Sequence, residues 1–176
     1  MGALENERSP LTQMKKMIAR ISPSIAYPFM RVSRAGELFK PYGWIIDYPK
    51  RGARRCGNLF RIVVRQRNAA GWRIAYLVVR DKVIDRLEQH PCSLESFEPV
   101  CGRSLLFVAR RRKAGDIACF LLDKPVVLKK GIWHGVVAMG KESDIKITEN
   151  ASVRCVYWKT GIRMGPWGMK PLTKRI

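Results

Sequence analysis

The chain has two histidines, and each lies in a short motif whose residue types could support chemistry. His90 follows Glu88 by two positions and precedes Glu95 by five, so this imidazole has a carboxylate on either side in the sequence. His134 comes three residues after Gly131, and glycine permits a tight turn. Imidazole exchanges protons near neutral pH and is the commonest metal ligand in proteins. If the fold joins the two motifs, they form either a metal site or a metal-free acid and base pair.

A mixed set of imidazoles and carboxylates suits a divalent ion such as zinc, manganese, iron or nickel. The candidate ligands are His90, Glu95 and His134, with Glu88 beside them. Residues on separate strands converge at the mouth of a β-barrel, where ligand sites commonly lie. We therefore expect His90 and His134 to face one cavity, with both glutamates on or near its wall.

The elements that must position these residues are predicted to be short β-strands. They are rich in Val, Ile, Leu and aromatic residues and are separated by turn signals. Strands at a spacing of about 8–12 residues are typical of a sandwich or barrel. The fold class is therefore all-β. The expected strands are Trp44–Tyr48, Leu59–Gln66, Trp72–Arg80, Val83–Leu87, Ser104–Ala109, Ile117–Leu122, Val126–Lys129, Gly135–Met139, Asp144–Thr148 and Val153–Trp158.

Three regions are expected along the chain: a basic N-terminal extension over residues 1–32, a barrel over 33–150, and a basic C-terminal strand and tail over 151–176. A short helix is predicted over residues 9–20, a helical turn over 36–39, and an irregular tail over 159–176. The formal net charge is +20. The excess lies in residues 1–71 and 151–176, so these flanks could attract nucleic acid or another polyanion, although their arginine clusters lack the spacing of a DNA-reading helix.

Composition narrows the location. No apolar run approaches the roughly 20 residues that a membrane span needs, and the N-terminus does not have the pattern of a signal peptide. The five cysteines are odd in number and widely spaced, which argues against a disulfide framework. These features predict a cytoplasmic protein without a membrane partner.

The two histidine motifs resemble those of the cupin family. In that family the first motif has two histidines two positions apart and then a glutamate, and the second has a histidine after a glycine turn. Here Glu88 stands in place of the first histidine, His90 matches the second, Glu95 matches the glutamate and His134 matches the second motif. The resemblance implies a cupin-like β-barrel or jelly roll, with His90, Glu95 and His134 as ligands if a metal is present.

A longer resemblance, over about residues 35–149, is to the ureidoglycolate lyases of purine catabolism. It rests on the opening segment Phe39-x-x-Tyr42-Gly43-x-Ile45-Ile46, on Leu87-Glu88-Gln89-His90-Pro91 with Phe97-x-Pro99, and on Gly131-Ile132-Trp133-His134. Three positions differ, because the family generally has Arg at Gln89, Gln at Glu95 and a second His at Gly135. The added negative charge of Glu95 would either favour a metal or disfavour an anionic substrate. The resemblance implies a cupin-like barrel that forms a homodimer.

The reaction that this resemblance implies is elimination of urea from ureidoglycolate, which leaves glyoxylate. A base must remove the hydroxyl proton while the carbon–nitrogen bond breaks. His90, His134 and Glu88 are the candidate catalytic residues, and Glu95 and Lys130 are the candidate substrate-binding residues. Two alternatives stay open: a metal-dependent cupin enzyme that acts on another small carboxylic acid, and a non-catalytic barrel whose basic flanks bind a polyanion.

Overall fold

The computed structural model describes residues 31–46, 62–65 and 71–172, and their regular structure is mostly β-strand. Two short 3₁₀ turns are present, η1 (Glu37–Phe39) and η2 (Ala114–Asp116). No helix in this part of the chain is long and apolar enough to cross a membrane. In chain order the strands are β1 (Val32–Arg34), β2 (Gly43–Ile45), β3 (Trp72–Val79), β4 (Ile84–Gln89), β5 (Glu95–Cys101), β6 (Ser104–Ala109), β7 (Ala118–Leu121), β8 (Val126–Leu128), β9 (Trp133–Ala138), β10 (Ser143–Asn150), β11 (Val156–Gly165) and β12 (Gly168–Pro171).

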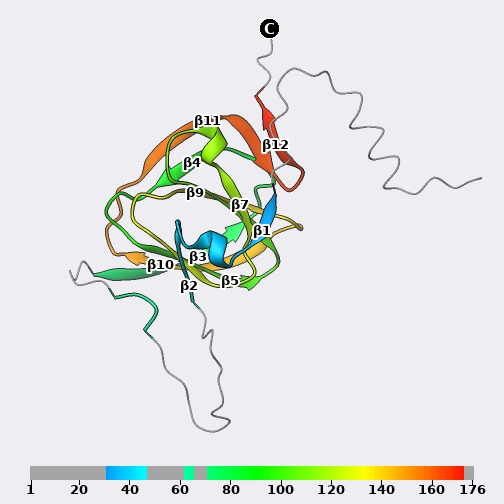
Figure 1. Cartoon of the computed structure of the whole chain (residues 1–176). Coiled ribbons are helices and arrows are strands. Elements are labelled where there is room, and N and C mark those ends of the chain that lie inside the picture. The colour runs from blue at the N-terminus through cyan, green and yellow to red at the C-terminus, as the bar shows by residue number, and fades with distance from the viewer. Residues whose placement is uncertain (1–30, 47–61, 66–70, 173–176) are drawn as a thin grey trace, which may run out of the picture.

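The strands pair as one long hairpin folded back on itself. β6 pairs with β7, β5 with β8, β4 with β9 and β3 with β10, and each of these pairs is antiparallel. They separate into a seven-stranded sheet, β1-β7-β6-β9-β4-β11-β12, and a five-stranded sheet, β2-β8-β5-β10-β3. Figure 1 shows β4, β9 and β11 on one side of the curled body and β3, β5 and β10 on the other. Nested pairs divided between two sheets are the topology of a jelly roll, which cupins share. The predicted all-β, cupin-like jelly roll is confirmed.

Apolar side chains fill the space between the two sheets. Leu106 and Val108 of β6 belong to this core together with Phe97 of β5 and Ile145 of β10, and each is almost fully buried. Alternate residues of a strand point to the same face, which is why Leu106 and Val108 lie together. Burying one such side chain contributes about 1.5–3 kcal/mol. This core sets the distance between the two sheets, both of which carry residues of the candidate site.

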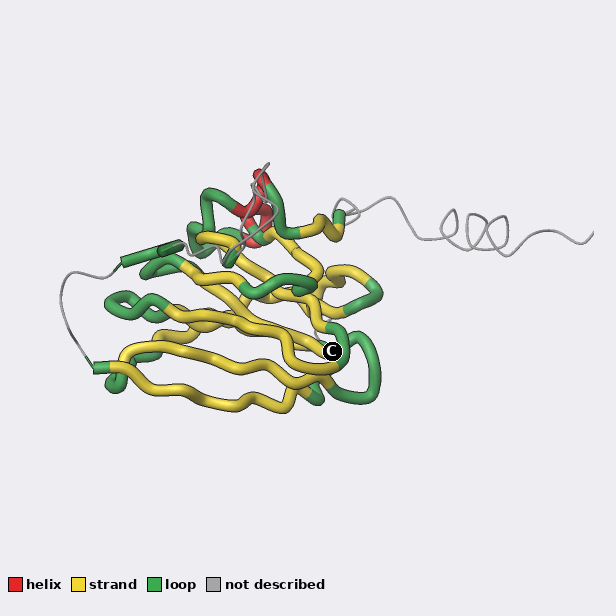
Figure 2. The backbone as a smooth tube through the Cα atoms, turned by 90° about the horizontal axis from the view of Figure 1, so that it is seen from below, coloured by secondary structure: helices red, strands yellow, loops and turns green. Residues whose placement is uncertain are grey.

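A second core covers the other face of the seven-stranded sheet. Leu105 and Phe107 of β6 belong to it, and Trp158 and Met164 of β11 pack in the same buried cluster. Because β6 has a core on each face, all six of its residues are buried. Figure 1 shows β11 arching across the body, and Figure 2 shows the strands running side by side beneath the turns. The C-terminal strand β11 therefore contributes buried side chains to the second core.

The irregular tail expected from residue 159 is the largest error of the sequence analysis. β11 continues to Gly165 and β12 follows it, so residues 159–165 and 168–171 are strand, and only 173–176 lie outside the described residues. Trp158, Ile162 and Met164 stand at even positions and are buried, which is the period of a strand. Glycine at 161, 165 and 168 obscured this period, although Gly161 and Gly168 are the two with positive φ, 75° and 106°.

Smaller differences concern β1, β5 and the expected strand Leu59–Gln66. Neither β1 nor β5, which contains Pro99, was among the expected strands. Pro99 is tolerated there because the register against β10 shifts beside its partner Ile145. Residues 62–65 form no strand, and the rest of Leu59–Gln66 lies outside the described residues, as does the helix expected over 9–20. The helical turn expected at 36–39 is present as η1.

Met164→Ala tests the role of β11. Met164 is fully buried in the second core, so we expect this variant to lower the free energy of unfolding by about 2–5 kcal/mol. Lys159→Ala, at an exposed position of the same strand, is the matched control and should change it by less than about 0.5 kcal/mol. Urea denaturation measures both. Equal, small effects would show that β11 contributes little to the fold.

Candidate metal centre

Three strands from both sheets carry the candidate residues to one place. Glu88 lies in β4 and His90 directly follows this strand, Glu95 begins β5, and His134 is the second residue of β9. β4 and β9 are neighbours in the seven-stranded sheet, and their register pairs Glu88 with His134. β5 belongs to the five-stranded sheet. The structure thus brings together four residues from both walls of the jelly roll, and their chemical roles stay predictions.

The three innermost side chains are in contact and out of water. Glu95 Oε2 lies 3.2 Å from His90 Nε2 and 2.9 Å from His134 Nε2. The side chains of all three are at most 6% exposed. The ring of Phe97 stands edge-on to His134 at 5.5 Å between centroids and closes one side of the group. One carboxylate oxygen therefore meets two imidazole nitrogens away from solvent.

Backbone carbonyls set the orientation of both imidazoles. His90 Nδ1 lies 3.4 Å from the carbonyl oxygen of Arg154, and His134 Nδ1 lies 3.0 Å from that of Ile132. A carbonyl oxygen accepts but cannot donate, so the neutral rings carry their proton on Nδ1. Their Nε2 lone pairs then face Glu95. Metal-binding histidines are commonly held in this way, with the second ring nitrogen donating to a carbonyl or carboxylate.

This orientation leaves an unsatisfied contact at the centre of the group. Among the described residues, Glu95 Oε2 and His134 Nε2 are the buried side-chain polar atoms without a hydrogen-bond partner. A carboxylate oxygen and the lone pair of an imidazole nitrogen repel each other, because both are hydrogen-bond acceptors. Burying two acceptors without a donor costs free energy. Either a proton on the imidazole or a cation bound by both groups would satisfy these atoms.

The charges of the group favour a cation. Burial lowers the pKa of both imidazoles, but Glu95, a backbone carbonyl and Glu88 together outweigh it, so both pKa values lie above the ordinary 6.5. Burial alone would raise the pKa of Glu95, but His134 and His90 bring it down to about 2. Glu95 is therefore ionised across the neutral range, and its negative charge is available to a proton or a metal ion.

The three donor atoms also have a spacing that fits one divalent ion. Ligands at 2.0–2.2 Å from a common ion are roughly 3 Å apart when they occupy adjacent positions. The two contacts of Glu95, at 2.9 and 3.2 Å, match that separation. The ligand atoms of His90, Glu95 and His134 all lie within 4.8 Å of one another. Two imidazoles and one carboxylate suit iron, manganese or zinc and leave positions open for a substrate.

Glu88 and Lys130 lie differently from the buried residues. Glu88 Oε1 is 3.7 Å from His134 Nε2, and its side chain is 38% exposed, so it borders the group on the side that solvent reaches. Lys130 is exposed in the turn between β8 and β9. Within the described part of the chain, no ion pair joins Lys130 to Glu88 or Glu95. Its role as a contact for a substrate carboxylate stays a prediction.

Contacts between the two motifs were not foreseen from the sequence. Gln89 Nε2 donates to the carbonyl oxygen of Gly131 at 2.6 Å, and the backbone N–H of Gly131 donates to the carbonyl of His90 at 2.9 Å. Gly131 has φ of +74°, which favours glycine. Cys155, which lies beside Glu88 and His90, was also missed. The position of Gln89 next to His90 was a signal for the first contact, whereas no sequence signal marked Cys155.

Comparisons with known proteins find solved structures that resemble the chain in part, at low sequence identity. No family model and no curated protein matches the chain. Solved structures that resemble it include an oxalate decarboxylase mutant of Bacillus subtilis, at 15% identity and a TM-score of 0.40 over 52% of this chain and 24% of that one. Another is a dTDP sugar isomerase of Desulfovibrio desulfuricans, at 18% identity and a TM-score of 0.38 over 62% of this chain and 71% of that one. The chain thus spans about a quarter of the decarboxylase, and its fold follows from the strand pairing itself.

The protonation of the group predicts how the metal-free protein responds to pH. The pKa of Glu95 falls on folding from 4.5 to about 2, so its contribution to stability is present above 4.5 and is lost as the pH falls through 2. Both histidine pKa values rise on folding, so their contribution is full below 6.5 and is lost as the pH rises through the folded values.

We therefore expect the group to stabilise the chelator-treated protein most between about pH 4.5 and 6.5. The measurement is the difference in free energy of unfolding between the unmodified chain and Glu95→Gln across this range. A difference that does not vary with pH would contradict the coupling of the three residues.

Proposed function

We propose that the protein is a metal-dependent enzyme of cupin-like fold that eliminates urea from ureidoglycolate or carries out a related reaction on another small carboxylic acid. The observation that supports a reactive centre most directly is the buried contact of Glu95 with two imidazoles. Glu95 Oε2 and His134 Nε2 have no hydrogen-bond partner among the described residues. The motif resemblance to ureidoglycolate lyases supports the choice of substrate. His90, Glu95 and His134 would hold the metal.

The buried residues of the centre are assigned metal binding, and the partly exposed Glu88 is assigned proton transfer. A bound divalent ion supplies Lewis acidity towards an oxygen of the substrate. His90 and His134 act as ligands in this arrangement, so they are not free to carry protons. Glu88 is the group left to do so, because it is partly exposed and lies 3.7 Å from His134. We assign it the proton of the substrate hydroxyl.

The elimination balances with these groups. Glu88 takes the hydroxyl proton, and the electron pair left on oxygen forms the carbonyl double bond of glyoxylate. The carbon–nitrogen bond breaks at the same time, and its electron pair stays on the nitrogen of urea. The nitrogen of urea then receives a proton, which Glu88 returns. Lys130, exposed in the turn before Gly131, is the candidate partner for the substrate carboxylate.

The test combines metal analysis with product formation. Protein purified without a polyhistidine tag is incubated with ureidoglycolate, and glyoxylate and urea are measured before and after treatment with a chelator. We expect equal amounts of both products, loss on chelation and recovery with one divalent ion. Glu88→Gln should lower kcat by about 10²–10⁴-fold while keeping the metal. Glu142→Gln, another partly exposed carboxylate, is the control.

Two results would contradict the proposal in different ways. Protein that binds a divalent ion but leaves ureidoglycolate unchanged would exclude this substrate and keep the metal centre, so other small carboxylic acids would be tested next. Product formation that a chelator does not affect would instead assign the chemistry to a metal-free acid and base pair.

A further inference from the structure

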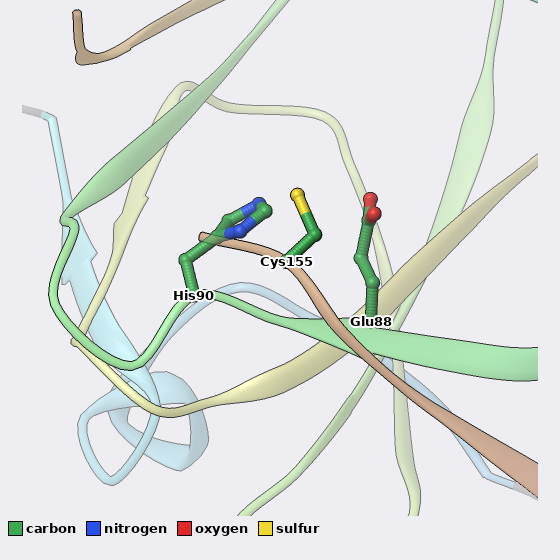
Figure 3. Close-up of side chains that lie close together, drawn as sticks. All are labelled: Glu88, His90 and Cys155. Atoms are coloured by element: carbon green, nitrogen blue, oxygen red, sulfur yellow. The ribbon is translucent and has the colours of Figure 1, made fainter. Parts of the chain in front are cut away.

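A second group of metal-ligand side chains adjoins the buried one. Cys155, in the segment that joins β10 to β11, offers its Sγ within 4.8 Å of ligand atoms of both Glu88 and His90. Figure 3 shows the thiol standing between the imidazole of His90 and the carboxylate of Glu88. Cys155 is exposed and Glu88 is partly exposed, whereas His90 is buried. This group therefore reaches from the surface to the buried centre.

Strand pairing fixes Cys155 in this place. β11 runs antiparallel to β4 with Val156 opposite Gln89, so one more step of the register brings Cys155 opposite His90. The preceding carbonyl, of Arg154, lies 3.4 Å from His90 Nδ1. Because backbone contacts on both sides of Cys155 involve β4 and His90, the thiol is held beside the imidazole by the sheet itself.

The side chains around the thiol are of the types that bind metal ions. Sγ of Cys155 lies within 4.8 Å of a ligand atom of Glu88 and of His90. A thiol, an imidazole and a carboxylate together are a donor set that zinc and similar thiophilic ions accept.

We infer that Glu88, His90 and Cys155 form an outer site for a thiophilic divalent cation, next to the buried set of His90, Glu95 and His134. The two sets share His90, whose single lone pair serves one cation at a time, and Glu88 lies 3.7 Å from His134 Nε2. A cation in the buried set therefore leaves Glu88 and Cys155 unligated. A cation arriving from solvent meets the exposed thiol and carboxylate first. The outer set is thus the point of entry to the buried centre. This inference deepens the proposed metal centre but depends on a different residue, Cys155.

Cobalt(II) is the probe that separates the two sets, because a thiolate ligand gives it a charge-transfer band in the near ultraviolet. The full chain, with phosphine reductant and no added thiol, is titrated with cobalt(II). We expect the band in the unmodified chain, and a loss of at least tenfold in its intensity in Cys155→Ser. Cys92→Ser and Cys101→Ser, at two other exposed cysteines, should keep it. His134→Ala should also keep it, since His134 belongs only to the buried set.

The outcomes distinguish this inference from the proposed function. Cobalt bound without the band, or a band that survives Cys155→Ser, overturns the outer site and leaves the buried centre standing. A band that needs Cys155 while His134→Ala changes neither cobalt stoichiometry nor affinity supports the outer site and contradicts the buried centre. No cobalt binding at all overturns both. Circular dichroism of each variant shows that a lost band is not a lost fold.

Discussion

His134→Ala is expected to weaken the binding of manganese, which does not favour thiolate ligands, by more than about 100-fold. Loss of a residue that merely orients a ligand typically costs 10–100-fold in metal affinity, and loss of a ligand costs more. His134 is 2.9 Å from Glu95 Oε2 and its side chain is 3% exposed, so its loss removes a buried donor from the centre of the group. Isothermal titration of the tag-free protein measures the affinity, and elemental analysis measures the metal retained on purification.

The matched control for this prediction is Glu149→Gln. Glu149 is also a buried carboxylate and lies opposite Glu95 in the β5–β10 register, but its partner is Arg73 at 2.7 Å. It should bind metal as the unmodified chain does. His134→Ala should keep a cooperative thermal transition, because two apolar cores hold the sheets. Unchanged metal affinity in a folded His134→Ala variant would remove this residue from the ligand set.

Glu95→Gln is expected to shift the pKa of both histidines from above 6.5 to below it in the metal-free protein. In the unmodified chain burial lowers these pKa values, and Glu95 is the leading influence among those that raise them. An uncharged amide at position 95 leaves burial as the main influence, which disfavours the imidazolium. The shift is read by NMR from the imidazole carbon-bound protons, and the two histidines of the chain give two signals to follow.

The same NMR titration carries its own controls. Glu149→Gln should leave both histidine pKa values in place, because Glu149 is paired with Arg73 outside the group. Asp85→Asn changes an exposed acid of β4 and should have little effect. If Glu95→Gln moves one histidine and not the other, the imidazoles do not share the carboxylate, and a single ion held by all three residues would be excluded.

The sequence predicted the fold class and the meeting of the two motifs for physical reasons that can be named. Strand period and turn residues are local, so β6, with its apolar run from Leu105 to Val108, was placed correctly. His90 and His134 could be singled out because the chain has two histidines, each in a short motif, and imidazole both exchanges protons near neutral pH and binds metals. The jelly-roll pairing that joins them is not local, and only the resemblance to cupins suggested it.

What the sequence did not predict depends on contacts between distant segments. The second core needs Trp158 and Met164 to fold over β6, and nothing in residues 156–165 alone specifies that partner. The approach of Cys155 to His90 follows from the β4–β11 register, which is again a pairing across the chain. The predictions of a homodimer and of polyanion binding by the basic flanks stay predictions, and residues 1–30 lie outside the described part of the chain.

The nested pairing of the strands implies an order in which the site can be assembled. The β6–β7 hairpin closes the shortest loop, while the pairs β5–β8, β4–β9 and β3–β10 close successively longer ones, and longer loops cost more entropy to close. His90, Glu95 and His134 belong to the second and third of these pairs, and Cys155 follows the last. During synthesis, the buried ligands can meet only after β9 has emerged, and the thiol joins them later still. An ion held by His90, Glu95 and His134 would therefore be captured late in the synthesis of this chain.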